Sequence, residues 1–311
     1  MKRYDVGIVI INYNNSDLAI ESVKSIIKNT TDGIDYHIIL VDNASEPDDY
    51  NKLLLLVNEL ASEKVELVRS VINTGFGGGN MFGIQHVNAT YYAFINNDTL
   101  LHNDCLSILK KYMDKHNEVA ISGPEILDEK LERKISFDHF VSVQREILGS
   151  RLLELINSKK CPNRKTQHET PIAVNYVNGS FMFCRAKDFD SIGGFDTNIF
   201  LFFEESDLSY RLLKQNKFTY FVPEAKYIHF QGKSMPSSTL TKIELKTSMF
   251  YVIRKHSGYL SYQFLRLLYI LRYGLTSIIK PKYFTLFLRI LIGLPISKSI
   301  KNNQKIVRLL F

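Results

Sequence analysis

Residues 91–95 form a run of strand-forming side chains that ends abruptly in Asn96, Asn97 and Asp98. In an open α/β sheet, ligands bind beyond the carboxyl ends of the strands, so these polar side chains would lie where a ligand binds. Oxygen ligands suit Mg²⁺ or Mn²⁺, and such a cation would in turn bind a diphosphate. The alternative is that the three residues only cap a turn before a helix near Cys105.

A second carboxylate, Asp42, follows the apolar run 37–41. At a strand end, a carboxylate can accept hydrogen bonds from a ribose hydroxyl or a base N–H, as in nucleotide-binding folds. Asp42 and the residues up to Ser45 are also common in turns and helix caps, so this pattern leaves both interpretations open.

Residues 75–80, with sequence GFGGGN, indicate a close approach between backbone and ligand. Glycines let backbone N–H groups approach a phosphate or nucleotide at a helix start. The segment is not a dinucleotide-binding fingerprint, because its sixth residue is Asn80 and it follows the third strand, and it lacks the Gly-Lys-Ser/Thr of a phosphate-binding loop. The alternative is an ordinary helix start.

Three acids, Glu204, Glu205 and Asp207, stand at the start of another expected helix. A carboxylate at a pocket rim can act as general base toward a hydroxyl, and the aromatic segment 195–203 before it would exclude water. The structural alternatives are a favourable interaction with the helix dipole and an Asp207–Arg211 ion pair at i,i+4.

A fifth cluster begins with His229 at the end of an expected strand. A neutral imidazole there could ligate a metal, and Lys233 with Ser234 could hold a diphosphate. The alternative is a structural histidine.

These clusters are positioned by strands and helices that alternate every 25–30 residues, which predicts βαβ units and a mostly parallel sheet. The expected strands are 6–11, 37–41, 65–68, 91–95, 119–122, 173–185 and 218–230. The expected helices are 16–28, 53–60, 75–87, 104–116, 143–156 and 204–216, with a turn at 189–196. The long polar segment 128–171 is expected to be functional or mobile.

The last part of the chain differs in composition. From residue 214 onward the only acids are Glu224 and Glu244, whereas Lys and Arg are frequent. We therefore divide the chain into a catalytic domain, 1–240, and a basic helical extension, 241–311. Arg266 and Arg272 argue against a transmembrane helix, and the amphipathic pattern favours helices lying on an anionic membrane surface. The alternative is packing on the catalytic domain or on another subunit.

The composition is that of an ordinary globular protein, with a net charge of +7 and three widely spaced cysteines. The cysteines fit a reducing compartment, and the apolar run near the N-terminus is too short for a signal peptide. We expect a cytoplasmic protein, peripheral at the inner face of the cell membrane, and leave its oligomeric state open.

Seven motifs occur in a characteristic order: INYNN, VDNAS, NTGFGGGN, NNDT, GSFMFCR with GGFD, FFEESDL and HFQGKS. Together they resemble the family 2 glycosyltransferases, and most of all the rhamnosyltransferase-like enzymes that build bacterial surface polysaccharides. The resemblance covers residues 4–234, about three quarters of the chain.

The resemblance implies a GT-A fold and an inverting transfer from a nucleoside-diphosphate sugar. It implies that the base and ribose of the donor contact Asn12, Tyr13 and Asp42, and that Asn73, Gly75 and Asn80 line the nucleotide pocket. It also implies an Asp-x-Asp-type motif at Asn96 and Asp98, with Asp98 on Mg²⁺ or Mn²⁺, and a catalytic base at Glu205. The remaining implied roles are a metal or phosphate contact at His229 and a diphosphate contact at Lys233.

The sequence departs from the family pattern at two of these positions. Asn96 replaces the first acid of the Asp-x-Asp motif, which leaves the need for metal open. Glu205 replaces the shorter aspartate, so Glu204 or Asp207 remains an alternative base.

The resemblance also implies partners: deoxythymidine diphosphate-rhamnose, or else a uridine diphosphate sugar, as donor, and a lipid-linked saccharide as acceptor. We expect no nucleic-acid partner. The competing hypotheses are a non-catalytic nucleotide-sugar-binding protein and a nucleic-acid- or membrane-binding module.

Overall fold

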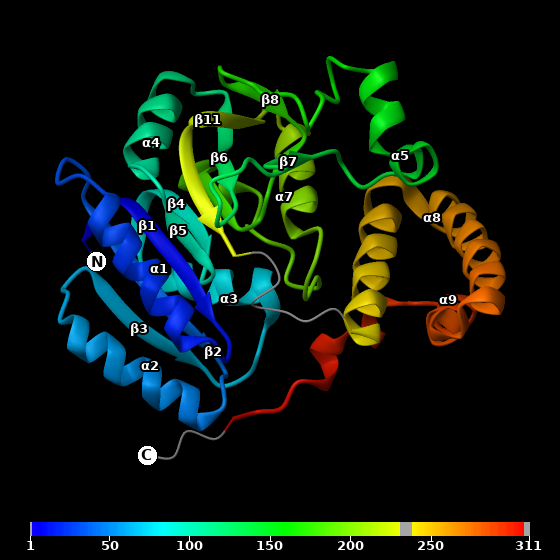
Figure 1. Cartoon of the computed structure of the whole chain (residues 1–311), viewed down its shortest axis with the longest axis horizontal. Helices are drawn as coiled ribbons and strands as arrows, with labels where there is room; N and C mark the ends of the chain where they lie inside the picture. The colour runs from blue at the N-terminus through cyan, green and yellow to red at the C-terminus, as the bar shows by residue number, and fades with distance from the viewer. Residues whose placement is uncertain (1, 231–237, 308–311) are drawn as a thin grey trace.

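The computed structural model describes residues 2–230 and 238–307, and in them a mixed, mostly parallel sheet is flanked by helices (Figure 1). The strands are β1 (Arg3–Asn12), β2 (Tyr36–Asn43), β3 (Val65–Ser70), β4 (Asn88–Asn96), β5 (Thr99–Leu101), β6 (Val119–Leu127), β7 (Phe137–Asp138), β8 (Ile172–Val174), β9 (Tyr176–Val177), β10 (Phe181–Arg185) and β11 (Phe218–His229). The α-helices are α1 (Ser16–Asn29), α2 (Pro47–Leu60), α3 (Gly75–Gly83), α4 (Cys105–Lys115), α5 (Val143–Ile156), α6 (Ala186–Ser191), α7 (Glu204–Leu213), α8 (Thr239–Ile279) and α9 (Phe284–Ile292).

The strand order in the large sheet is β3–β2–β1–β4–β10–β6–β11–β5, and β8 also pairs with β11. Strands β1 to β4 are mutually parallel in the pairs that they form, and β6 is parallel to β11. Strand β10 runs antiparallel between β4 and β6, and β5 runs antiparallel to β11. The polar ends of β1, β2 and β4 therefore meet at one edge of the sheet, as the βαβ pattern predicts.

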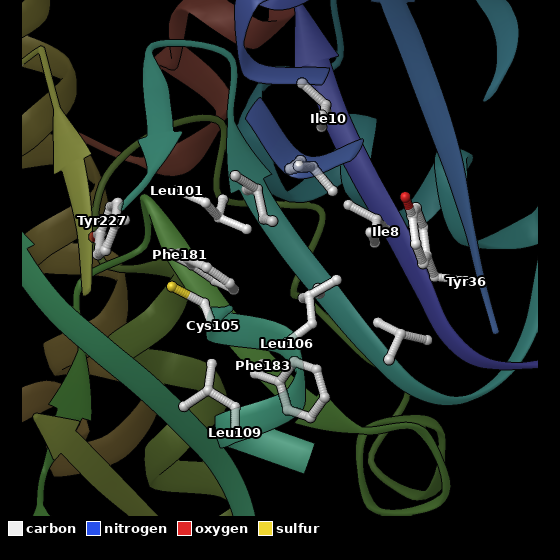
Figure 2. Close-up of a cluster of buried hydrophobic side chains, with 14 of the residues drawn as sticks. Ile8, Ile10, Tyr36, Leu101, Cys105, Leu106, Leu109, Phe181, Phe183 and Tyr227 are labelled. Carbon is white, nitrogen blue, oxygen red and sulfur yellow. The ribbon is translucent and has the colours of Figure 1, made fainter. Parts of the chain in front are cut away.

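The β-branched runs form these strands because both faces of the sheet are covered. On one face, Ile8 and Ile10 of β1 belong to a core with Leu106 and Leu109 of α4 (Figure 2). On the other face, Val9 packs in a second core beneath α3 and α6. Each of these aliphatic side chains is fully buried, which stabilises the fold by about 1.5–3 kcal/mol per side chain.

The structure confirms most of the expected elements and corrects three. The expected strand 173–185 is divided into β8, β9 and β10, because Asn175 turns its side chain to Phe140 N and Lys160 O and interrupts the run. The expected turn at 189–196 begins inside a helix, α6. The short strand β5, directly after Asp98, was not expected.

The C-terminal extension is tied to the rest of the molecule along the first half of α8. Gly258, with a φ of 86°, bends α8 into two segments. Before the bend, Met249 and Phe250 are buried in a third core, which also contains Ile199 from the segment before α7. The chain then returns past α9 toward β3, where Val307 N donates to Val71 O at 2.8 Å (Figure 1). This packing confirms the alternative that the extension packs on the catalytic domain, as far as its first half is concerned. The domain boundary at residue 240 stays a prediction.

Among the described residues, no helix is both long enough and apolar enough to cross a membrane.

Candidate active site

The ends of three neighbouring strands bring Asn12, Asp42 and Asn96 to one edge of the sheet. Asn12 is the register partner of Asp42, and Asn96 pairs with the other side of β1 at Ile11. Asn12 Nδ2 donates to Asp42 Oδ1 at 3.4 Å and to Asp49 Oδ2 at 2.9 Å. The structure thus brings together residues from three predicted motifs that are up to 84 residues apart.

Asp42 is fully buried beside a guanidinium that the sequence analysis did not single out. Arg69 Nε lies 3.1 Å from Asp42 Oδ2, and the Arg69 guanidinium stacks 3.7 Å above the ring of Tyr50. Burial raises the pKa of Asp42, although hydrogen bonds from Ser45 and the charge of Arg69 oppose this shift. The carboxylate is therefore held in a fixed orientation at the strand end.

Tyr13, next to Asn12, is 44% exposed, so its ring is available to stack on a flat ligand.

The predicted nucleotide loop is shaped by Asn43, another residue that the analysis passed over. Asn43 Nδ2 donates to Asn73 Oδ1 at 3.0 Å and to Gly75 O at 3.2 Å, and Asn43 Oδ1 accepts from Thr74 N at 3.1 Å. Asn80 is buried, and its amide donates to Phe76 O inside α3. Asn73 and Asn80 therefore use these side-chain atoms to hold the loop and helix.

The glycines of this segment are required chiefly by backbone conformation and packing. Gly75 has a φ of +74°, and a Cβ there would lie 2.1 Å from Phe200 O. At Gly83, at the end of α3, a Cβ would lie 2.5 Å from the side chain of Val9. Any larger residue would push α3 away from the sheet or distort the loop. These contacts support the alternative that the glycines are needed for the conformation of an ordinary helix start. They leave the backbone N–H groups as possible contacts for a phosphate.

Asp98 and His229, the two candidate metal ligands, lie side by side. Asp98 is buried, and His229 Nε2 is 3.2 Å from Asp98 Oδ1. The antiparallel pairing of β5 with β11 positions them, because Thr99 is the register partner of His229. Asp98 does not cap the following helix, since Asp104 does so by accepting from Ser107 N. Asn97 and Asp98 do lie in a turn, between β4 and β5, as the turn alternative also predicts.

A carboxylate oxygen beside an imidazole nitrogen is a donor pair that suits Mn²⁺ better than Mg²⁺, which prefers oxygen ligands throughout. Within the described part of the chain, no group of three or more His, Cys, Asp or Glu side chains is arranged to hold a metal. A cation here would therefore need further ligands from a bound diphosphate or water. Lys233, the predicted diphosphate contact, lies outside the described residues.

The acids at the start of α7 follow two residues in the left-handed region, Phe202 (φ 75°) and Phe203 (φ 70°). This sharp turn presents the first turn of α7 to the sheet. Glu204 is buried next to α3, with its Cγ 3.7 Å from the position of a Cβ on Gly77. Glu205 is partly exposed, and its carboxyl carbon lies 3.6 Å from the corresponding position on Gly179.

Burial raises the pKa of Glu205 to about 7, with a contribution from the negative charge of Asp138. Burial also raises the pKa of Glu204 well above its usual range, and the charges of Glu205 and Glu244 add to the effect. Burial therefore opposes ionisation of both carboxyl groups, and Glu205, with a pKa of about 7, can gain or release a proton near neutral pH. A group with this property is suited to general acid–base catalysis.

The surroundings of Asp207 lower its pKa, in contrast to those of Glu204 and Glu205. Its buried carboxylate contacts Arg211 Nε at 2.7 Å, Lys255 Nζ at 2.7 Å and His256 Nε2 at 2.8 Å. Despite burial, which acts to raise it, the pKa of Asp207 falls to about 2 because of these partners. The predicted Asp207–Arg211 pair is confirmed, and a carboxylate held by three cationic or imidazole groups is poorly suited to accept a proton.

The segment before β10 connects the acids of α7 with the end of β4. Asn96 N donates to Ser180 O at 2.9 Å, and the residue before Ser180 is Gly179, against which the Glu205 carboxyl lies. The base candidate and the NNDT motif are thus separated by a single short backbone segment.

The irregular segment 128–171 contributes charged side chains near Glu205 that the sequence analysis did not assign. Asp138 accepts from Arg145 at 2.5 Å and from Arg164 at 2.9 Å. The charges of Asp138 and Glu205 raise the pKa of Tyr176, after burial. The sequence feature that could have indicated these side chains is the occurrence of oppositely charged residues in a long irregular segment of a compact domain.

Comparison with known proteins matches residues 7–193 to the sequence model of Glycosyl transferase family 2. The chain is 27% identical over 264 residues to rhamnosyltransferase WbbL of Escherichia coli, covering 80% of this chain and 93% of that protein. It is 22% identical to the dTDP-rhamnosyl transferase RfbF of Shigella flexneri, covering 72% and 68%. A shorter match, 34% identical over 89 residues, is to the N-acetylglucosaminyl-diphospho-decaprenol L-rhamnosyltransferase of Mycobacterium tuberculosis, covering 28% and 29%.

Among solved structures, the mannosyltransferase PcManGT of Pyrobaculum calidifontis, in complex with GDP-Man and Mn²⁺, superposes with a TM-score of 0.57 at 12% identity. The match covers 81% of this chain and 64% of that one. At this identity the similarity shows the fold alone, and it confirms the expected GT-A fold.

Proposed function

The chain belongs to glycosyltransferase family 2, and on this premise we propose that it transfers a sugar, with rhamnose favoured, from a nucleoside diphosphate to a hydroxyl of a lipid-linked saccharide. The proposed context is cell-surface polysaccharide synthesis. The names of the similar enzymes support rhamnose, a deoxythymidine diphosphate donor and a polyprenol-linked acceptor. A uridine diphosphate sugar remains the second choice of donor.

The observation that carries this proposal is the position and protonation of Glu205. Its carboxyl lies against Gly179, one residue from the backbone that pairs with the end of β4, and its pKa is about 7. A glutamate in this state can remove a proton from an acceptor hydroxyl at neutral pH. We therefore assign the base to Glu205 and not to Glu204 or Asp207.

In the proposed reaction, Glu205 takes the proton of the acceptor hydroxyl, and the oxygen forms a bond to the anomeric carbon. The bond from that carbon to the diphosphate oxygen breaks, and the diphosphate leaves with the bonding electron pair. Attack from the face opposite the leaving group inverts the anomeric configuration. Tyr13 and Asp42 orient the base and ribose of the donor.

Asp98 and His229 would hold the cation, which supplies charge neutralisation for the leaving diphosphate when bound. A carboxylate oxygen together with an imidazole nitrogen favours Mn²⁺ over Mg²⁺. Asn96 lies at the same strand end and would contact the diphosphate or a metal-bound water.

The extension would hold the enzyme at an anionic membrane, where a lipid-linked acceptor resides. Support comes from the exposed apolar side chains of its second half, which lie among basic residues. The exposed apolar residues include Leu260, Leu267, Leu271, Leu275, Ile278, Ile279 and Ile292.

The test is calorimetric binding of a panel of nucleoside diphosphates and their sugars, with and without Mn²⁺, to the wild type and Asp98→Ala. We expect one nucleotide to bind best, Mn²⁺ to strengthen binding by at least about ten-fold, and Asp98→Ala to lose this metal dependence. Asp32→Ala, which removes an exposed carboxylate before β2, away from the strand ends, is the control.

Rhamnose transfer to a lipid-linked saccharide is measured in parallel. Tight donor binding without hydrolysis or transfer would favour the non-catalytic sugar-nucleotide binder. Equal, metal-independent binding by the wild type and Asp98→Ala would remove Asp98 from the metal site.

A further inference from the structure

A large cavity lies outside the candidate active site, among α5, α7 and the bend of α8 (Figure 1). Its volume is about 870 Å³, within the size range of small-molecule sites. Phe218 and Thr219, at the start of β11, line it. His229 is at the opposite end of this 12-residue strand. Since a strand rises about 3.3 Å per residue, the cavity and the Asp98–His229 pair are roughly 30 Å apart along β11.

Two buried polar side chains in the cavity wall have atoms with no hydrogen-bond partner in the described part of the chain. They are Ser209 Oγ and His139 Nδ1, and each residue is 1% exposed. His139 Nε2 faces Glu154 Oε1 at 3.1 Å. Hydrogen bonds from Arg164 and His139 lower the pKa of Glu154 although burial opposes them, so Glu154 is ionised and His139 Nε2 carries the proton.

Burial lowers the pKa of His139, so the imidazole is neutral and its Nδ1 is a hydrogen-bond acceptor. Leaving such an atom unpaired in a buried wall is unfavourable. A hydroxyl can pair with either His139 Nδ1 or Ser209 Oγ, because a hydroxyl both donates and accepts.

The charge of the cavity wall is entirely positive or neutral. Among the described residues that line it there is no Asp or Glu, whereas Lys159, Lys160 and Lys217 are present. Lys217 is paired with Asp188 at 3.2 Å, but the structure records no ion pair for Lys159 or Lys160 in the described ranges. Both are exposed at the rim. The cavity therefore favours an anionic group at its entrance.

An apolar groove continues from this cavity. It shares Ser142, Gln144 and Ser257 with the cavity wall and is otherwise lined chiefly by Val143, Leu260 and Phe264. Leu260 is 83% exposed and Phe264 is 50% exposed. Both precede the exposed leucines of the second half of α8. The groove thus connects a polar, cationic cavity with the surface that we assign to the membrane.

We propose that this cavity and groove bind one anionic phospholipid whose headgroup carries hydroxyls, such as phosphatidylglycerol. The headgroup hydroxyls pair with His139 and Ser209, the phosphodiester lies at Lys159 and Lys160, and an acyl chain follows Val143, Leu260 and Phe264. This inference rests on the membrane association in the proposed function and adds a specific lipid site to it, remote from the donor site.

The test is binding of the full chain to phosphatidylcholine vesicles that contain either phosphatidylglycerol or phosphatidylethanol at the same molar fraction. The two lipids carry the same charge, but only phosphatidylglycerol has free headgroup hydroxyls. We expect about five-fold tighter binding to phosphatidylglycerol, as one additional hydrogen bond provides. Ser209→Ala should reduce this preference to near unity while retaining binding to both vesicles.

Lys159→Gln combined with Lys160→Gln should weaken binding to phosphatidylglycerol vesicles by roughly 25-fold, about five-fold for each lysine. The matched control is Lys111→Gln combined with Lys130→Gln, which removes the same charge from exposed sites elsewhere. Equal loss in both double variants, or equal wild-type affinity for the two vesicle types, would overturn the site. Binding of soluble glycerophosphoglycerol as tightly as the lipid, and sensitive to Ser209→Ala, would overturn the lipid as ligand.

Donor hydrolysis by each variant in lipid-free solution separates this inference from the proposed function. Donor hydrolysis without a preference for phosphatidylglycerol would contradict the lipid site alone. A preference for phosphatidylglycerol without any donor binding would contradict the proposed transferase activity alone.

Discussion

Three acids within four residues of α7 have different protonation states because their surroundings differ. Burial and neighbouring carboxylates raise the pKa of Glu204 well above its usual range, whereas the cationic groups around Asp207 lower its pKa to about 2. Glu205 lies between these extremes, with a pKa of about 7. The helix dipole acts on all three acids, so it does not account for the differences between their pKa values. The differences arise from neighbouring residues that belong to other elements.

At the residue scale, we expect Glu205→Gln to lower kcat for transfer by about 10²–10⁴-fold, since the amide cannot take the hydroxyl proton. Donor affinity should change little. In the wild type, kcat/KM should rise with pH up to about 7, because the base acts only when ionised. The measurement is transfer rate against pH for both proteins.

The comparison variant is Glu204→Gln, which replaces a buried carboxyl group whose pKa is raised with an amide of similar size. A loss confined to Glu204→Gln would move the base to that residue.

At the element scale, Asp207 is a link between α7 and α8. Lys255 and His256 lie on α8 just before its bend, and both contact the Asp207 carboxylate. Lys255 also contacts Asp196 at 2.7 Å, in the segment before α7. The start of the extension is therefore fixed to the helix that carries Glu205, so displacement of α8 would disturb the candidate active site.

We expect Asp207→Asn to destabilise the protein by about 3–5 kcal/mol, since it leaves buried cationic groups without their partner. The folded pKa of about 2 lies below the ordinary aspartate pKa of 3.8. Asp207 therefore contributes stability above pH 3.8, roughly 2 kcal/mol, which is lost as the pH falls toward 2. Urea unfolding of both proteins at neutral and acidic pH measures this.

The control is Asp17→Asn, which breaks an exposed pair with Lys52 and should cost at most about 1 kcal/mol. A variant Asp207→Asn as stable as this control would contradict the structural role.

At the scale of the whole molecule, the extension has one attached and one exposed part. The first half of α8 is buried against the domain, and the second half with α9 exposes leucines and isoleucines. The described C-terminal segment then returns to Val71, next to the nucleotide loop. The surface proposed for the membrane and the donor site therefore belong to one connected structure.

We expect Leu275→Asp combined with Ile278→Asp to weaken binding to anionic vesicles by at least about ten-fold, because each buried aliphatic side chain contributes about 1.5–3 kcal/mol. Both are more than two-thirds exposed, so folding and donor binding should be unchanged. Vesicle co-sedimentation and donor calorimetry are the measurements. Leu55→Asp, at an exposed site on α2, is the control, and an equal effect there would argue against the membrane surface.

The sequence by itself predicted a mostly parallel sheet, which the structure confirms, and it proposed a site at the strand ends. Long β-branched runs alternate with amphipathic helices, and each run ends in polar residues, so the local pattern carries this information. Asp42 and Asp98 could be selected this way, whereas Glu205 was selected from a cluster of acids at a helix start.

Tertiary structure alone decided the chemistry of those residues. The sequence offered three acids as bases, and the contacts from α3, α8 and residue 138 separated them. It showed Arg69 and Asn43 only as ordinary strand residues, because their partners are at least 19 positions away. Burial and ion pairing depend on elements that meet only in the folded chain, and these two effects set protonation. Strand and helix formation depends mainly on neighbouring residues, which is why the sequence could predict it.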